Sequence, residues 1–460
     1  MYQIDFNRPQ KIYFIGIGGI SMSGLAEILF DEGFQVMGSD MKKSELTDRL
    51  EQKGIKVEYG QRASNIPADT QVVVYTAAIH PDNPEFVAAK EMGIPMLARA
   101  ELLGELMRNY HHAVNIAGTH GKTTTTSMLT EILLAGEKDP TVTVGGILPA
   151  IGGNIRVGGS ELFVAEACEY TNSFLSFFPT MEIILNIEAD HLDFFKDIED
   201  IRHSFRRFAQ KLDEKGILII NREIPRLEEI TEGLPCKVIT FGRNPETSNY
   251  SAAEITYDQY ARASYTLMID GKPEGKIVLG VPGEHNVYNS LSVVAAGREL
   301  GITLEQIQKG LKCFSGTNRR FEKKGEIGGV TVIDDYAHHP QEIRATLTTA
   351  KNYPHRKIWC VFQPHTYSRT AALLDEFAQA LLLADEVILA DIYAAREVNT
   401  IGITSQDLAD KIREAGGRVH YIPSFDEIET FILENCVPGD LLITMGAGDI
   451  VKVGEKLLGM

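Results

Sequence analysis

The residues with the clearest chemical meaning lie in the stretch NIAGTHGKTTTTSM, residues 115–128. An apolar strand pattern, AVNIA, runs directly into the glycines and then into a helix with an apolar face. In that setting backbone N–H groups and the helix N-terminus can hold a phosphate, Lys122 adds positive charge, and the Thr123 hydroxyl can bind Mg²⁺. The usual phosphate-loop spacing needs Gly at position 116, which is Ile, and Gly118 comes instead. The stretch predicts a phosphate site, with a chance match at a helix start as the alternative.

Acidic side chains and a histidine follow the neighbouring strand patterns. Glu166 and Glu169 come after ELFVA, whereas Asp190, His191 and Asp193 come after EIILNIE. Because ligands gather at the carboxyl ends of parallel strands, we expect these groups beside the phosphate loop. A carboxylate suits a hard cation, and an imidazole suits softer metals better. Helix capping is the alternative for the Asp-His pair, but its place beside the loop favours a role in the site.

A second glycine-rich turn, GIGGISMSG, comes much earlier, at residues 16–24. It departs from the dinucleotide pattern G-x-G-x-x-G because Ser21 holds the third glycine position. Asp40 ends the next strand pattern, QVMGSD, so the turn still resembles a fingerprint in which an acidic side chain meets a ribose. Taken alone, this signal leaves a nicotinamide-dependent oxidoreductase open.

Composition and charge narrow the class of protein. A chain of 460 residues, 44% hydrophobic and 23% charged, is typical of a globular protein with two or three domains. The formal charge of −18 argues against a nucleic-acid partner, which needs a basic face. The N-terminus has no apolar signal core and no stretch is apolar enough to span a bilayer, so we expect a cytoplasmic protein with no membrane partner. The five cysteines are odd in number and widely spaced, which indicates neither a disulfide framework nor a zinc cluster.

Short runs rich in Val and Ile alternate with helical patterns such as residues 101–110 and 284–300, which is typical of parallel α/β architecture. The expected strands cover residues 11–15, 35–37, 71–75, 113–117, 161–167, 182–188 and 216–221, short strands within 237–282, and residues 328–336, 357–363, 386–392, 418–422 and 440–446. We therefore predict three α/β domains, over residues 1–109, 110–319 and 320–460. The first and third are expected to be Rossmann-like, and the second carries the phosphate loop.

Nine motifs in register extend this reading over the whole chain. They are GIGGISMSGLA, GTHGKTTTT, EACEY, NIEADHLD, GEHNVYN, GTNRRFE, DDYAHHP, QPHTYSRT and MGAGDI. With these motifs the sequence resembles the Mur ligases, the amino-acid-adding enzymes of peptidoglycan precursor synthesis, and among them the member that adds L-alanine. The loop of that family reads G-T-[HN]-G-K-T, which accounts for the missing glycine.

The resemblance implies an activity. ATP would phosphorylate the carboxylate of UDP-N-acetylmuramate to an acyl phosphate, and the amine of L-alanine would attack it, with ATP and Mg²⁺ required and a monomer or weak homodimer expected. One alternative is the related recycling ligase, which attaches a preformed tripeptide to the same UDP-sugar. Other classes are a nicotinamide-dependent oxidoreductase, which leaves GTHGKTT, Glu166 and RRFE unexplained, and a non-catalytic nucleotide-binding regulator, which would not need the intact set of lysine, threonine and acids.

The resemblance also implies roles for individual residues. The catalytic residues would be Lys122, Glu166, His191 and Arg320, and the metal ligands Thr123, Glu166 and His191. The ATP contacts would be Gly118, Thr119, His120, Gly121, Lys122, Thr123, Thr124, Asn289 at the adenine, Arg320 at the γ-phosphate and Asp335 at the ribose. The contacts to the UDP-substrate would be Gly16, Gly18, Gly19, Ser21, Ser23, Asp40, Tyr336, His338 and Arg369. Because Arg320 and Asp335 lie at the edge of the third domain, that domain would have to close onto the second.

At three places the sequence differs from its relatives, which limits how far the family's residue roles apply to this chain. Thr366 stands where several relatives have an arginine, so Arg369 would carry that charge alone. EACEYTNSF replaces the more acidic EADESD form, which keeps Glu166 and Glu169 but removes the other carboxylates. Phe208 stands near the place where sibling ligases have a carbamylated lysine, so we predict no carbamylation here. For His339, capping of the helix that follows is the alternative to a role in the site.

Overall fold

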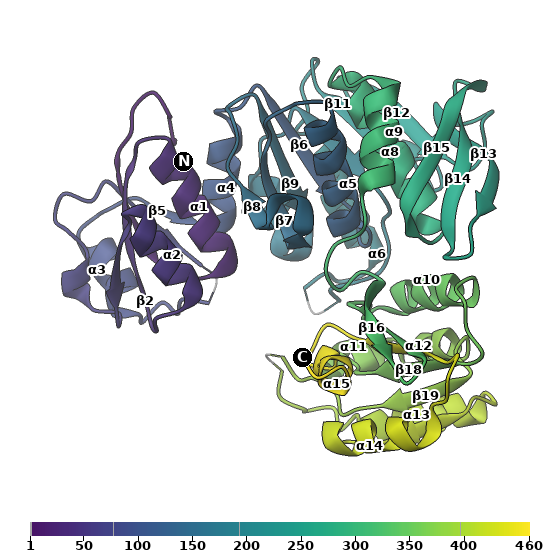
Figure 1. Ribbon diagram of the computed structural model, residues 1–460. Coiled ribbons are helices and arrows are strands. Elements are labelled where there is room, and N and C mark those ends of the chain that lie inside the picture. The colour runs from purple at the N-terminus through teal and green to yellow at the C-terminus, as the bar shows by residue number, and fades with distance from the viewer. Residues whose placement is uncertain (1, 77, 193, 396) are drawn as a thin grey trace.

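The computed structural model of the protein describes residues 2–76, 78–192, 194–395 and 397–460. Figure 1 shows three α/β units: an N-terminal unit in purple at the left, a central unit in blue to green, and a C-terminal unit in green to yellow below the central one. Each unit is built on its own sheet. The predicted three-domain α/β architecture is confirmed.

The N-terminal domain is a five-stranded parallel sheet with helices packed on it. Its strands are β1 (Lys11–Ile15), β2 (Gln35–Asp40), β3 (Lys56–Tyr59), β4 (Val72–Tyr75) and β5 (Met96–Ala98). Its helices are α1 (Ile20–Asp31), α2 (Glu45–Lys53), the short η1 (Ala63–Asn65), α3 (Pro84–Glu91) and α4 (Arg99–Met107). The strand order β3-β2-β1-β4-β5 reverses between β1 and β4, and ligands of such sheets bind outside the strand ends at that reversal. The first glycine-rich turn follows β1 and therefore lies there.

The central domain has a ten-stranded sheet in the order β15-β14-β13-β12-β11-β10-β6-β9-β7-β8. Its strands are β6 (His112–Ala117), β7 (Thr141–Leu148), β8 (Gly153–Arg156), β9 (Leu162–Ala167), β10 (Met181–Ile184), β11 (Ile217–Asn221), β12 (Lys237–Gly242), β13 (Tyr250–Tyr257), β14 (Arg262–Ile269) and β15 (Lys272–Pro282). Its helices are α5 (Lys122–Ala135), η2 (Pro149–Ile151), η3 (Tyr170–Ser176), α6 (Ile198–Ala209), α7 (Glu228–Thr231), α8 (His285–Glu299) and α9 (Leu304–Cys313). The consecutive strands β12-β11-β10-β6-β9-β7 run parallel. The edge strand β8 pairs antiparallel with β7, and β13 to β15 form an antiparallel end.

One expected strand of this sheet is shorter than predicted. The run at 182–188 is a strand only as far as Ile184, and residues 185–188 continue without strand pairing. The reason lies in the neighbouring strand β6, which ends at Ala117 where the chain turns into the phosphate loop. Beyond the strand, Leu185 N–H donates to Ala117 O at 3.0 Å, and Thr119 N–H of the loop donates to Asn186 O at 3.3 Å. The following residues are thereby free to serve the loop.

The C-terminal domain has a six-stranded sheet in the order β16-β17-β21-β18-β19-β20. Its strands are β16 (Glu322–Ile327), β17 (Val330–Asp335), β18 (Ile358–Phe362), β19 (Glu386–Leu389), β20 (Val419–Tyr421) and β21 (Leu441–Met445). Its helices are α10 (Pro340–Lys351), α11 (Tyr367–Ala372), α12 (Leu374–Leu381), α13 (Ser405–Glu414), α14 (Phe425–Asn435) and α15 (Val451–Leu457). Only β16 among these strands runs antiparallel to its neighbour.

The two domain interfaces differ in chemistry. A single hydrophobic cluster runs from the N-terminal domain into the central one, and within it the rings of Tyr110 and Phe163 lie 4.9 Å apart. In the described part of the chain, by contrast, the clusters of the C-terminal domain contain no residue of the central domain. The first interface is thus a shared core, and the second depends on polar contacts. Among the described residues, no helix combines the length and apolar character needed to cross a membrane.

Candidate active site

The phosphate loop joins β6 to α5 and is shaped by two glycines. Gly118 has φ +145° and Gly121 has φ +84°, values that side-chain-bearing residues rarely adopt. A Cβ added at Gly121 would also lie 3.0 Å from Oδ1 of Asn289 on α8. These conformations lead the chain into α5, whose first N–H groups have no partner within the helix and can bind a phosphate.

The conformation of the loop is held by a residue that the sequence did not point to, Asn186. Its Oδ1 accepts the backbone N–H of His120 at 2.8 Å, and its Nδ2 donates to His120 O at 3.1 Å. The hydroxyl of Thr119 accepts the N–H of Glu188 at 3.0 Å. Residues 185–188, which follow the early end of β10, thus fix one side of the phosphate loop. The only sequence signal was the run NIEAD directly after an apolar strand.

Lys122, the first residue of α5, is held at the mouth of the loop. Its Nζ donates to Gly118 O, to Thr119 O at 3.1 Å and to Oε2 of Glu169 at 3.1 Å. Burial alone would lower the pKa of Lys122, but the Glu169 carboxylate raises it well above its usual value. The lysine is therefore charged and aimed at the place where phosphate oxygens would lie.

Carboxylates and an imidazole gather at the same edge of the sheet, as expected from the strand ends. Nε2 of His191 lies 3.9 Å from Oε1 of Glu169 and 3.8 Å from Oδ2 of Asp190. Glu166 lies on β9 beside Ile116 of β6 and accepts the backbone N–H of Gly145. Asp193 lies outside the described residues. The edge thus combines oxygen and nitrogen donors next to the charged lysine.

Arg320 brings the third domain to the phosphate loop. Its Nη2 lies 3.5 Å from the hydroxyl of Thr123, which is buried in the first turn of α5. Its guanidinium lies 5.3 Å from the ring centroid of Tyr336. Thr123 and Arg320, predicted as metal ligand and γ-phosphate contact, therefore meet.

A cavity of about 220 Å³ opens beside the loop, between the central and C-terminal domains. Six of the predicted ATP contacts line it: His120, Gly121, Thr124, Asn289, Arg320 and Asp335. Nδ2 of Asn289 donates to Oδ1 of Asn286 at 3.0 Å, so α8 fixes the orientation of that amide. The cavity is continuous with the phosphate loop through His120 and Gly121, which suits a nucleotide whose phosphates lie on the loop.

Asp335 holds the wall of this cavity in addition to lining it. Its carboxylate accepts the N–H groups of Ala337 and Phe321, at 2.8 and 2.9 Å, and the hydroxyl of Thr346 at 3.1 Å. Burial raises the pKa of Asp335 to about 6. Because Phe321 follows Arg320 directly, this carboxylate fixes the segment that delivers the arginine.

The predicted substrate contacts of the C-terminal domain are Tyr336, His338 and Arg369. A second cavity, of about 530 Å³, lies between this domain and the central one. Arg369 on α11 lines this cavity, and its Nη2 lies 3.0 Å from Oδ1 of Asp190. Burial alone would raise the pKa of Asp190, but Arg369 and His191 hold it well below its usual value. Burial lowers the pKa of His338 to about 4, so its ring is neutral; Nδ1 lies 3.0 Å from Tyr336 O.

The other predicted substrate contacts form a separate group in the N-terminal domain. Gly16, Gly18 and Gly19 follow β1, and the N–H of Gly18 donates to Oδ2 of Asp40 at 2.8 Å. Ser21 is exposed in the first turn of α1, whereas Ser23 is buried and its hydroxyl donates to Ile20 O at 3.1 Å. In this structure the Ser23 hydroxyl is thus bonded inside the helix, and its role as a substrate contact stays a prediction. In the described residues no hydrogen bond or ion pair joins this group to Tyr336, His338 or Arg369.

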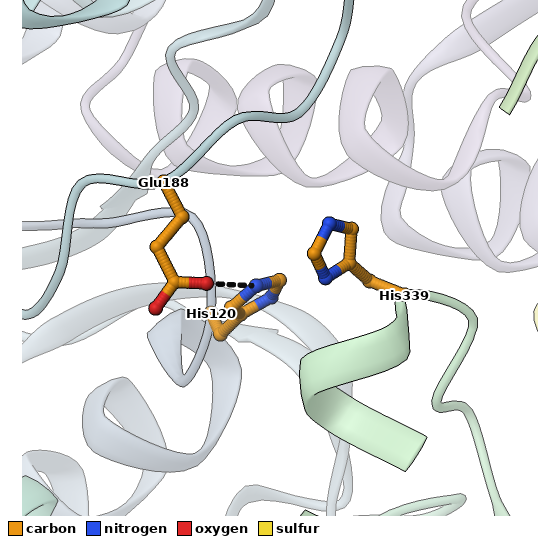
Figure 2. Close-up of side chains that lie close together, drawn as sticks. All are labelled: His120, Glu188 and His339. Carbon is orange, nitrogen blue, oxygen red and sulfur yellow. Dashed lines mark ion pairs between the residues drawn. The ribbon is translucent and has the colours of Figure 1, made fainter. Parts of the chain in front are cut away.

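Figure 2 shows His120 between Glu188 and His339, which come from the central and C-terminal domains. Nε2 of His120 lies 3.3 Å from Glu188, and Nδ1 lies 3.3 Å from Oε1 of Glu342 on α10. Burial alone would lower the pKa of His120, but these two carboxylates raise it to about 9. The ring is therefore held between the two carboxylates as an imidazolium.

His339 caps α10, as the alternative interpretation of this residue expected. Its Nδ1 accepts the N–H of Gln341 at 3.3 Å, so Nε2 carries the proton and faces Ala189 O at 3.2 Å. Both ring nitrogens of His339 are thus engaged. The ion pair in Figure 2 joins His120 to Glu188 within the central domain, and the His339 ring packs against His120 from the C-terminal domain with ring centroids 4.7 Å apart. Glu342 and Glu188, like Asn186, were not singled out from sequence.

Three family models match the chain, one for each of its three domains. Residues 11–111 match the Mur ligase family catalytic domain, residues 116–297 the Mur ligase middle domain, and residues 319–448 the Mur ligase glutamate ligase domain. The chain belongs to the Mur ligase family.

Individual Mur ligases match along their whole length. The UDP-N-acetylmuramate–L-alanine ligases of Lachnospira eligens and Agathobacter rectalis are 63% and 61% identical over 458 residues, covering 100% of both chains in each case. Among solved structures, the UDP-N-acetylmuramate–alanine ligase of Thermotoga maritima superposes with a TM-score of 0.79 at 32% identity, over 98% of each chain. A murein peptide ligase of Psychrobacter arcticus gives a TM-score of 0.69 at 25% identity, again over 98% of each chain.

Two positions at which this Mur ligase departs from sibling sequences have defined places. Thr366 adopts φ +67°, and its hydroxyl accepts the N–H of Arg369 at 3.4 Å, so it caps α11. Phe208 on α6 is fully buried and stacks on Phe174 with ring centroids 4.4 Å apart. The first residue therefore orients the helix that carries Arg369, and the second belongs to the core.

Proposed function

We propose that this chain is an ATP-dependent ligase that joins L-alanine to the carboxylate of UDP-N-acetylmuramate in peptidoglycan precursor synthesis. One observation carries the proposal: Lys122, Glu169 and His191 lie together at a sheet edge in a chain that is 63% identical, end to end, to such a ligase. We place the enzyme in the cytoplasm, where nucleotide-linked precursors and ATP are available, and expect a monomer or weak homodimer.

ATP fits the cavity between the central and C-terminal domains. The loop N–H groups and Lys122 would hold the phosphates, and Arg320 would reach the γ-phosphate from the opposite side. Asn289 would meet the adenine, and Asp335 the ribose, because both line the cavity. This arrangement needs contributions from both domains, so ATP would bind them together.

Mg²⁺ fits the oxygen donors at the loop. The hydroxyl of Thr123 and the carboxylate of Glu166 are hard ligands of the kind this cation prefers, and His191 with Glu169 would hold a second metal. When bound, the cation neutralises negative charge as a phosphoryl group is transferred.

The chemistry needs two displacements. A carboxylate oxygen of the sugar attacks the γ-phosphorus and ADP leaves, which gives an acyl phosphate, a mixed anhydride whose phosphate is a good leaving group. The unprotonated amine of L-alanine then attacks the acyl carbon, and inorganic phosphate leaves as the amide forms. Lys122 and Arg320 supply fixed positive charge to the oxygens that gain negative charge in the first step. The protein contributes mainly position and charge.

The UDP end of the substrate would lie in the N-terminal domain. Gly16, Gly18 and Gly19 lie in the turn that leads into α1, and the N-terminus of that helix favours a diphosphate. The sugar would extend toward the second cavity, in which Arg369 and His191 would flank the reacting carboxylate. The two glycine-rich turns thus serve two different nucleotides.

Phosphate release with UDP-N-acetylmuramate, ATP and Mg²⁺ tests the proposal, with L-alanine, glycine, L-serine and the tripeptide offered one at a time. We expect turnover with L-alanine, and none without an amine. Turnover with the tripeptide alone would assign the recycling activity instead. No release with any of the four would refute a ligase of this kind.

A further inference from the structure

The contact between the central and C-terminal domains includes several pairs of polar groups as well as an aromatic contact, in which the rings of Tyr260 and Tyr353 lie 5.7 Å apart. Arg369 pairs with Asp190 across it at 3.0 Å, and Nη2 of Arg320 lies 3.5 Å from the Thr123 hydroxyl. Because no hydrophobic cluster of the described residues spans the two domains, these polar contacts help to fix their relative position. The group of this kind that the ligase mechanism leaves without a role is Glu342.

Glu342 uses its two carboxylate oxygens in different directions. Oε2 accepts the backbone N–H groups of His338 and His339, at 3.0 and 3.3 Å, which closes the N-terminal cap of α10. Oε1 faces the other domain, 3.3 Å from Nδ1 of His120 and 4.0 Å from Nη1 of Arg320. One oxygen is thus fixed to the C-terminal domain, and the other reaches the phosphate loop.

His120, which Glu342 contacts, cannot move independently of the phosphate loop. The backbone of His120 is fixed on both sides by the amide of Asn186, at 2.8 and 3.1 Å. Its ring is held on the other nitrogen by Glu188 at 3.3 Å. A displacement of α10 must therefore either break the contact to His120 or distort the phosphate loop.

Both partners of this contact are charged. Burial alone would raise the pKa of Glu342, but Nδ1 of the neutral His338 ring, 3.3 Å away, and the cations His120 and Arg320 hold it well below its usual value. The imidazolium of His120 lies between two carboxylates, and Arg320 adds a second cation beside Glu342. Charge-assisted hydrogen bonds of this kind, shielded from solvent, are stronger than neutral ones.

We propose that Glu342 is a positioning residue that docks the C-terminal domain on the phosphate loop through His120, and so sets where Arg320 and Asp335 meet ATP. The inference rests on the proposed function for its effect on turnover, but not for its effect on domain position. It assigns a role to a residue that touches no reacting atom.

Glu342→Gln is a suitable test, because the amide keeps an oxygen for the cap of α10 and removes only the charge. We expect ATP to bind at least about tenfold more weakly, because the two domains would then occupy the arrangement that binds ATP for a smaller fraction of the time. His120→Asn should give the same loss. If the two residues act through one contact, the double variant should be no worse than either single variant.

The measurements are ATP affinity by calorimetry, without turnover, and the radius of gyration by small-angle X-ray scattering. Glu455→Gln is the matched control, because Glu455 pairs with Lys324 at 3.0 Å inside the C-terminal domain. The control should keep the wild-type affinity and dimensions, whereas Glu342→Gln should expand the unliganded protein. Unchanged affinity and dimensions in Glu342→Gln, or additive losses in the double variant, would overturn the proposal.

A kinetic readout separates this inference from the proposed function. In Glu342→Gln the KM for ATP should rise with a smaller change in kcat, and saturating ATP should restore most of the rate. Absence of phosphate release in the wild-type protein would refute the ligase function. The scattering and calorimetry of the variants would still decide the role of Glu342.

Discussion

Nζ of Lys122 lies 3.1 Å from Oε2 of Glu169, and the lysine also donates to Thr119 O of its own loop. Glu169 is 2% exposed, so the ion pair is shielded from water. The pair holds the lysine across the mouth of the phosphate loop, where an incoming phosphate would compete with the carboxylate. The lysine is therefore already in position to stabilise the negative charge of a phosphate group.

Lys122→Ala should lower kcat at least about a hundredfold, because removing one preorganised charge donor commonly has that effect. Binding of UDP-N-acetylmuramate, measured by calorimetry, should change little, since the glycine-rich turn for the UDP end lies in another domain. Loss of both turnover and UDP-sugar binding would contradict this division of the two nucleotides between domains.

Gly121→Ala should weaken ATP binding as well as stability. The residue has φ +84°, and its added Cβ would lie 3.0 Å from Asn289 at the cavity wall. Gly416→Ala is the matched control, because Gly416 has the same φ of +84° with nothing within 4 Å of an added Cβ. Both variants should lose about 1 kcal/mol of stability from the backbone conformation. Only Gly121→Ala should lose affinity for ATP; equal affinities would show that the loop tolerates a side chain there.

Arg369→Ala should lower the melting temperature, because it leaves Asp190 buried and unpaired. The two side chains are only 12% and 10% exposed, and breaking such a pair costs about 3 kcal/mol. Adding Asp190→Asn should recover part of that loss. Arg413→Ala, which removes an exposed pair with Asp410, should change stability by less than about 1 kcal/mol. A melting temperature for Arg369→Ala equal to that of Arg413→Ala would argue against an interdomain role for the pair.

The domain contact should weaken at alkaline pH. Pairing with Glu188 and Glu342 raises the pKa of His120 from 6.5 to about 9 in the folded protein. A group with a raised folded pKa stabilises fully below its unfolded value and loses that contribution as the pH passes the folded value. The radius of gyration should therefore rise as the pH increases through about 9, and His120→Asn should remove this transition. A transition that persists in the variant would assign it to another group.

The architecture could be predicted because its elements carry local signals. Runs such as KIYFI and IWCVF are almost entirely buried, so their apolar composition identified β1 and β18. The phosphate loop is likewise contained in one strand-loop-helix segment. The early end of β10 at Ile184 could not be predicted, because it depends on where the neighbouring strand β6 stops.

Parts of the site could not be predicted from the sequence, because they depend on contacts between distant residues. The contact of His120 with Asn186 joins positions 66 residues apart, and that with Glu342 joins two domains. Asn186 follows a strand and Glu342 follows a His-Pro pair. Asn and Glu are common in turns and helix caps at such places, so their residue types alone did not indicate a role in the site. Glu342 could have been noticed from the spacing of a helix cap, but its second oxygen faces a partner that only the fold brings near.

The central claim is that the sugar carboxylate is activated by ATP before the amine attacks. UDP-N-acetylmuramate labelled with heavy oxygen in that carboxylate tests it directly, with mass spectrometry of the inorganic phosphate formed in the presence of L-alanine. The account predicts one labelled oxygen in each phosphate, transferred as the acyl phosphate breaks. Unlabelled phosphate would contradict it.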